Sequence, residues 1–169
     1  MSDSVYNWYA LFVRSHHEFV TKAQLLKLGI EAFLPSVTKM RRWSDRGKAI
    51  TIPLFPGYVF VHIRPSAETF LKVVKTHGSV SFVSQEQGRP TPVDPAEMHA
   101  LQLMLARNGE IDIYPHLCEG ATVVIKSGPL QGAAGILAKK GNDNLFLVNV
   151  EILGRCVGMK INADELDPN

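Results

Sequence analysis

The sequence predicts an α+β domain, built from an antiparallel sheet with flanking helices, followed by a small all-β barrel. Two observations carry this prediction. Strand and helix signals are mixed over residues 1–108, in an order typical of a mostly antiparallel sheet. Residues 118–169 instead hold short strand patterns between glycine-rich turns, with no convincing helix. Residues 109–117 lack periodicity, contain a proline and are the proposed linker.

The first domain is expected to open with a strand and a helix. Residues 8–14 (WYALFVR) have the composition of a strand. Ser15 and Glu18 have the spacing of a capping box, in which each side chain satisfies a backbone N–H at the start of a helix. Apolar residues then recur at helical spacing until Gly29, which is expected to end the helix.

A basic hairpin is predicted next. Residues 30–37 look like a strand until Pro35 interrupts them. Residues 39–48 (KMRRWSDRGK) contain five basic residues and one acidic residue. The turn is expected at residues 45–48, between strands over 38–43 and 49–52.

The strand over residues 58–63 has two apolar faces. Alternation places Tyr58, Phe60 and His62 on one face and the intervening valines and isoleucine on the other. Either the second face is covered within its own domain, or it is left for a partner.

Two further helices and a strand complete the first domain. Pro65 and Ser66 begin a helix that ends at Gly78, and a strand is expected over residues 80–84. The third helix starts with Asp94 at the N-cap, proline at the first helical position and glutamate at the third, and it ends at Gly109.

The second domain is predicted to be all β. Strands are expected over residues 121–126, 135–138, 145–151 and 157–161. Residues 145–153 (LFLVNVEIL) form an apolar run that periodicity alone cannot assign, although its β-branched residues favour a strand.

Composition indicates a soluble globular protein. The chain has 169 residues, 46% of them hydrophobic, and a net charge of +2. No apolar run approaches the roughly 20 residues of a membrane span, and the N-terminus lacks a secretory signal. Cys118 and Cys156 lie far apart without a C-x-x-C, which fits a reducing cytoplasm and argues against a metal site.

No motif for catalysis is present. The six histidines show no metal-ligand spacing, and neither a nucleophile elbow nor a phosphate-binding loop is found. We therefore expect no enzyme activity, no catalytic residue, no metal and no cofactor.

Four phrases resemble the NusG/RfaH family of transcription elongation factors. They are PLFPGYVFV at residues 53–61, RRWSDRGK at 41–48, RPTPV at 89–93 and EGATVVIKSGPLQGAAGIL at 119–137. The resemblance implies an N-terminal NusG (NGN) domain over 1–108 and an SH3-like KOW barrel over 118–169. The KOW motif falls on Gly120, Val123, Ile125, Gly128, Pro129, Leu130, Gly132 and Gly135.

The resemblance implies docking on bacterial RNA polymerase, on the clamp of the largest subunit and the gate region of the second-largest. The matching positions are Phe12, Leu54, Phe55, Tyr58, Phe60, Thr69 and Phe70. An exposed aromatic patch needs such a partner to be tolerated in a soluble protein. The alternative is that these aromatics are ordinary core.

A second set of residues is a candidate for contact with non-template single-stranded DNA in a paused complex. Its members are Arg14, His16, His17, Lys39, Arg41, Arg42, Trp43, Arg46 and Lys48. The cations would attract phosphates and Trp43 would stack on an unpaired base. The alternative is a solvated surface.

Three functions are compatible with these features. The first is a specialised, cytoplasmic elongation factor that suppresses pausing and termination in long operons and associates with the nucleoid through RNA polymerase. The second is a general NusG that couples polymerase to Rho or the ribosome. The third is a ribosome-associated RNA-binding KOW protein. The turn Leu130-Gln131-Gly132-Ala133 lacks the bulky aromatics that general NusG proteins use for partner contact, which disfavours Rho and leaves a ribosome contact open. The aromatic docking strand argues against the third function.

Overall fold

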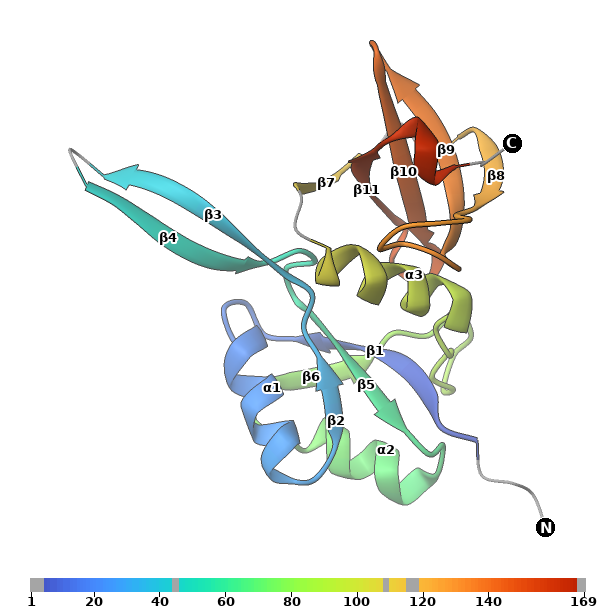
Figure 1. Cartoon of the computed structure of the whole chain (residues 1–169). Helices are drawn as coiled ribbons and strands as arrows, with labels where there is room; N and C mark the ends of the chain where they lie inside the picture. The colour runs from blue at the N-terminus through green and yellow to red at the C-terminus, as the bar shows by residue number, and fades with distance from the viewer. Residues whose placement is uncertain (1–4, 44–45, 108–109, 115–118, 167–169) are drawn as a thin grey trace. The chain divides into compact units, whose positions relative to one another are not determined.

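The computed structural model of the chain describes residues 5–43, 46–107, 110–114 and 119–166, without the side chains of residues 41–46. The chain divides into two compact units, Met1–Pro92 and Val93–Asn169 (Figure 1). None of the helices in the described ranges is long and apolar enough to cross a membrane.

The first unit is built on a four-stranded antiparallel sheet with the strand order β2-β5-β1-β6. Its strands are β1 (Asn7–Val13), β2 (Glu31–Phe33), β5 (Tyr58–Ile63) and β6 (Ser79–Phe82), and its helices are α1 (Glu18–Lys27) and α2 (Ala67–Val74). This arrangement confirms the predicted α+β class.

One face of this sheet forms the core with the two helices. Tyr9, Leu11 and Val13 alternate on β1, as Val59, Val61 and Ile63 do on β5, and all six side chains are buried in one cluster. Leu25 of α1 and Val73 of α2 complete that cluster. Burying this face removes apolar area from water, which is the main favourable term in folding.

The first helix does not begin with the predicted capping box. His17 occupies the N-cap of α1 and makes no side-chain capping hydrogen bond. The Glu18 carboxylate instead accepts a hydrogen bond from the backbone N–H of Gly57. The prediction was wrong because the local spacing of Ser15 and Glu18 cannot reveal a partner 39 residues away. The predicted N-cap at Asp94 is confirmed, because its side chain accepts from Ala96 N. Ser66, which was expected to begin the second helix, is also an N-cap and accepts from Thr69 N.

The basic hairpin is longer than the sequence suggested. Strands β3 (Ser36–Trp43) and β4 (Arg46–Pro53) form a separate two-stranded ribbon (Figure 1). The register pairs Trp43 with Arg46, so the predicted turn at residues 45–48 is wrong. The residues between them, 44–45, lie outside the described part of the chain.

The second unit combines one helix with a five-stranded antiparallel sheet of order β7-β11-β10-β9-β8. Its elements are α3 (Pro95–Ala106), β7 (Ile111–Ile113), β8 (Ala121–Val124), β9 (Ala134–Lys140), β10 (Asp143–Val150) and β11 (Arg155–Ile161), with short 3-10 helices at Glu151–Leu153 and Ala163–Glu165. After α3, the described residues of this unit form strands and the two short 3-10 helices, which confirms the small β fold predicted for the second half of the chain. The ambiguous run over residues 145–153 is a strand for most of its length.

The compact units do not follow the proposed boundaries. The expected linker, 109–117, contains β7, which pairs with β11. The third helix, expected in the first domain, groups with the second unit. Helix α3 has buried residues on more than one side, including Met98, Ala100 and Leu101, so sequence order alone could not show which unit it packs with.

Cys156 lies buried on β11. The other cysteine, at position 118, falls outside the described residues.

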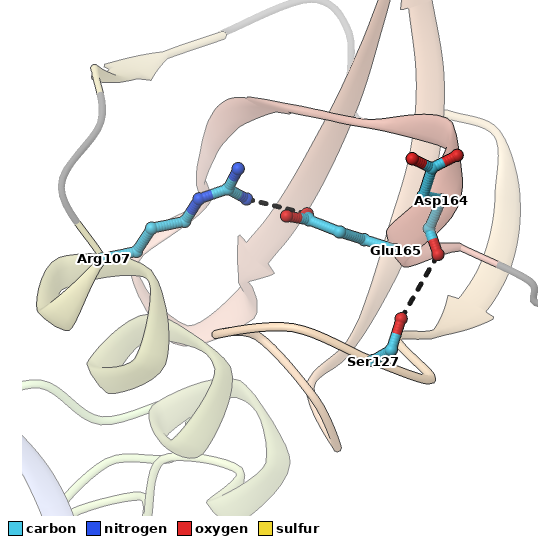
Figure 2. Close-up of polar contacts among 4 residues, drawn as sticks. All are labelled: Arg107, Ser127, Asp164 and Glu165. Atoms are coloured by element: carbon cyan, nitrogen blue, oxygen red, sulfur yellow. Dashed lines mark hydrogen bonds and ion pairs between the residues drawn. The ribbon is translucent and has the colours of Figure 1, made fainter.

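Polar contacts at both ends connect α3 to the rest of the second unit. At the C-terminal end, the Arg107 guanidinium lies 2.9 Å from the Glu165 carboxylate, and both side chains are largely buried (Figure 2). Ser127 donates to the carbonyl oxygen of Asp164 at 3.2 Å beside this ion pair. At the other end, Glu97 accepts from the backbone N–H of Glu151 at 3.4 Å.

Glu97 should make the stability of the second unit depend on pH. Burial, together with the neighbouring charges of Asp94 and Glu151, raises its pKa to about 7. A carboxyl whose pKa is higher in the folded state binds its proton preferentially there, so stability falls as pH rises between about 4.5 and 7. We expect Glu97→Gln to flatten this part of the curve, measured by urea unfolding followed through NMR signals of β10. A slope identical to that of the unsubstituted chain would contradict the assignment.

Candidate functional site

An aromatic pair lies on the sheet face opposite the helices. Antiparallel pairing places Phe12 of β1 directly across from Tyr58 of β5, and their ring centroids are 5.6 Å apart. Phe12 keeps 41% of its surface exposed, and Tyr58 is half-buried. We call this pair the Phe12–Tyr58 surface. Of the residues predicted to bind polymerase, these two are the ones on this face of the sheet that solvent reaches.

Three other members of that set are buried. Phe60 is fully buried, and its ring contacts those of Phe33 and Phe55 at centroid distances of 6.4 Å and 6.1 Å. Leu54 and Phe55 are also buried. The expectation that Phe60 lies on an exposed docking face is therefore wrong. Alternation placed it on the correct face but could not show that the middle of this face is closed.

The two predicted residues on α2 lie on the helix side of the sheet. Phe70 packs edge-on against Tyr9 and Phe82, at centroid distances of 5.3 Å and 5.2 Å, beside the core. The Thr69 hydroxyl contacts the Ser66 hydroxyl at 2.8 Å. The structure therefore does not bring Thr69 and Phe70 together with the Phe12–Tyr58 surface.

A polar and aromatic cluster that the sequence did not predict lies at the other end of β1. The rings of Trp8 and His62 stack with centroids 4.7 Å apart, and His62 Nδ1 lies 2.8 Å from Glu31. Strand register explains the cluster, because Trp8 and Glu31 both pair with His62 from neighbouring strands. Only the pairing of three strands that are distant in sequence brings these residues together.

The turn before Tyr58 is fixed by its backbone. Gly57 has a φ of +89°, a conformation that favours glycine. Its carbonyl oxygen accepts from Val13 N at 2.8 Å, and its N–H donates to Glu18 at 2.9 Å. The sequence placed Glu18 in a helix cap and gave no sign of its contact with Gly57, since no local pattern marks a long-range hydrogen bond.

The predicted nucleic-acid-binding residues lie on two elements. Arg14 and His16 are exposed after β1, and His16 has a positive φ of 62°. His17 is half-buried, with Nδ1 2.9 Å from the Ser15 carbonyl oxygen and its ring 5.6 Å from that of His77. On the hairpin, Lys39 and Lys48 are exposed. The side chains of Arg41, Arg42, Trp43 and Arg46 fall outside the described part of the structure.

The glycine-rich turn of the second unit is tightly held. Gln131 N donates to the carbonyl oxygen of Gly128, and Gly132 N donates to that of Ile125. Leu130 and Ala133 point inward and are fully buried, while Gln131 and Gly132 are exposed. Gly135 is required by a close approach, because a Cβ there would lie 2.7 Å from the Phe146 ring. The exposed part of this turn offers a polar side chain and no aromatic.

Comparison with known proteins settles the family. A family model described as transcription termination factor nusG matches residues 6–102. The chain belongs to the NusG family. Proteins named transcription termination/antitermination protein NusG from Staphylococcus carnosus (strain TM300) and Staphylococcus aureus (strain N315) are 27% identical to it over 174 residues, covering 95% of this chain and 94% of theirs. The resemblance drawn from the sequence motifs is thus confirmed.

One solved structure shows the same fold. It is described as "Domain interaction in Thermotoga maritima NusG" and aligns with a TM-score of 0.54 at 24% identity, covering 96% of both chains. At the level that the family supports, the protein is a transcription termination/antitermination factor.

The difference in burial between Phe60 and Tyr58 can be tested by measuring how much an alanine substitution at each position destabilises the protein. Phe60→Ala removes a fully buried ring and should cost about 3–5 kcal/mol of unfolding free energy, whereas Tyr58→Ala, at a half-buried position, should cost clearly less. Urea denaturation of both variants measures the difference. Equal losses would show that Tyr58 belongs to the core.

Proposed function

We propose that the protein is a specialised NusG-like elongation factor that binds RNA polymerase through the Phe12–Tyr58 surface. By binding, it suppresses pausing and termination and promotes antitermination of long operons. The observation that carries the proposal is an aromatic pair on the sheet face opposite the helices, in which Phe12 is exposed and Tyr58 is half-buried. Apolar side chains of this size in solvent are typical of a protein-binding site. The proposed partner is the clamp of the largest polymerase subunit, and the proposed location is the cytoplasm.

The proposed mechanism requires no chemistry from the protein. A factor that binds the active form of polymerase more tightly than the paused form shifts the population toward the active form. A difference of about 1.4 kcal/mol in binding free energy changes the ratio tenfold. The role is therefore that of a binding protein without a catalytic residue or cofactor.

For Thr69 and Phe70 we propose a contact with polymerase that is separate from the Phe12–Tyr58 surface. Because they lie on the helix side of the sheet, they would serve a separate contact, with the gate region of the second-largest subunit. The hairpin, Arg14, His16 and His17 are proposed to contact non-template single-stranded DNA in a paused complex. The supporting observation is the exposure of Lys39 and Lys48 on one ribbon, where cations can reach phosphates.

A second candidate is a general NusG that couples polymerase to Rho or the ribosome. The similarity to Staphylococcus proteins of that name along almost the whole chain favours it. The exposed Gln131 and Gly132, where a bulky side chain would serve partner contact, favour the specialised factor and make a Rho contact doubtful. A ribosome contact through the second unit stays compatible with both candidates. Genomic occupancy separates them, since a general factor occupies most transcribed genes and a specialised one only a few operons.

Replacing Phe12 and Tyr58 by alanine should weaken binding to RNA polymerase. The loss of a central aromatic contact typically costs 2 kcal/mol or more, which is about 30-fold in Kd. Leu26→Ala is the matched control, because Leu26 is also an exposed large apolar side chain but lies on α1. Fluorescence anisotropy with labelled protein gives the affinities. If the double variant binds with wild-type affinity, the Phe12–Tyr58 surface is not the polymerase-binding site.

The hairpin lysines should contribute through phosphate contacts. Lys39→Ala with Lys48→Ala should weaken binding to single-stranded DNA in a paused complex and reduce its salt dependence by about 0.7 in slope for each lost contact. Lys126→Ala with Lys139→Ala removes the same charge from exposed positions of the second unit and controls for net charge. Affinities measured at several salt concentrations decide the matter, and identical slopes for both double variants would reduce the hairpin to a solvated surface.

A further inference from the structure

Glu18 is a buried carboxylate whose hydrogen bond leads to the candidate surface. It is the first residue of α1 and is only 6% exposed. Its Oε1 atom accepts from the backbone N–H of Gly57 at 2.9 Å. Removing a carboxylate from water is costly unless hydrogen bonds compensate for it. An apolar side chain would fill this buried position without the cost of removing a charge from water. The presence of a carboxylate therefore points to a role for its hydrogen bond with the Gly57 N–H.

Gly57 connects Glu18 to both rings of the Phe12–Tyr58 surface. The carbonyl oxygen of Gly57 accepts from Val13, the residue after Phe12, and Tyr58 follows Gly57 directly. A Cβ on Gly57 would lie 3.4 Å from the Phe12 ring, so the turn passes close beside that ring. With its N–H held by α1 and its carbonyl oxygen held by β1, the peptide units on both sides of Gly57 are fixed.

We propose that Glu18 is a positioning residue for the Phe12–Tyr58 surface. Its carboxylate anchors the Gly57 amide and so keeps Tyr58 paired with Phe12 in the arrangement that binds the partner. The inference rests on the proposed polymerase-binding function of this surface. Without the anchor, the turn samples other conformations, and the apparent affinity falls in proportion to the fraction of molecules with the surface formed.

Thr21 supplies a matched control on the same helix. It is fully buried, and its hydroxyl donates to the carbonyl oxygen of His77 at 3.0 Å. Each of these two buried residues thus makes a hydrogen bond from the first turns of α1 to the backbone of a distant turn. Only the bond of Glu18 leads to Gly57, whereas that of Thr21 leads to the turn before β6.

The test compares three variants of the full chain. Glu18→Met removes the acceptor at similar size, Glu18→Gln keeps an acceptor oxygen without the charge, and Thr21→Val removes the control hydrogen bond. Three quantities are measured: the Kd for RNA polymerase, the hydrogen-exchange rate of the Gly57 amide in the free protein, and the urea midpoint of unfolding.

We expect Glu18→Met to speed exchange at Gly57 and to weaken polymerase binding about tenfold, which corresponds to a binding-competent fraction of about one in ten. Glu18→Gln should restore most of both. Thr21→Val should lower the urea midpoint while leaving the affinity and the Gly57 exchange rate unchanged.

Different results would contradict the positioning role of Glu18 and the proposed docking of the Phe12–Tyr58 surface on RNA polymerase. Unchanged Gly57 exchange in Glu18→Met, or equal weakening of binding by Thr21→Val, would overturn the positioning role and leave the docking proposal intact. If Phe12→Ala and Tyr58→Ala keep wild-type affinity, the docking proposal fails, and the positioning role for that surface fails with it. The Gly57 exchange rate then reports only whether the local anchor exists.

Discussion

The antiparallel pairing of β1 with β5 is the constraint on which the first unit depends. Its register sets Phe12 across from Tyr58 and Trp8 across from His62. Because side chains alternate along each strand, the same register sends the remaining valines, isoleucine and leucine of these strands to the helices. A slip of one residue would exchange the two faces, burying the aromatic pair and exposing the core. Folding and the candidate surface are therefore specified by one set of backbone hydrogen bonds.

The face opposite the helices serves two purposes along its length. In the middle, Phe60 and Ala10 are fully buried and contribute to stability. At one end, Phe12 and Tyr58 remain in contact with solvent, held by the turn at Gly57. Within this face, the pair is the part of the proposed polymerase-binding set that reaches solvent. An aromatic pair on a rigid sheet loses little conformational entropy on binding, which suits the docking role proposed for it.

Much of the fold could be predicted from the sequence because its signals are local. The alternation over residues 58–63 predicted the correct faces of β5, Ser66 lies at the start of the helix that it was expected to begin, and Asp94 is the N-cap that it was expected to be. The errors arose where a long-range contact competes with a local pattern. Glu18 fits a capping box by spacing but bonds to Gly57, and Phe60 shares a face with Tyr58 but not its exposure. The placement of α3 in the second unit likewise depends on contacts such as the Arg107–Glu165 ion pair, which no local pattern marks.

The central claim is that the Phe12–Tyr58 surface touches RNA polymerase. Site-specific photo-crosslinking tests it most directly, with a photoreactive phenylalanine analogue at position 12 in the full chain bound to transcribing polymerase. The account predicts a crosslink to the largest subunit that is lost when the analogue stands at Leu26, an exposed position of α1. A crosslink from position 26 with none from position 12 would contradict it.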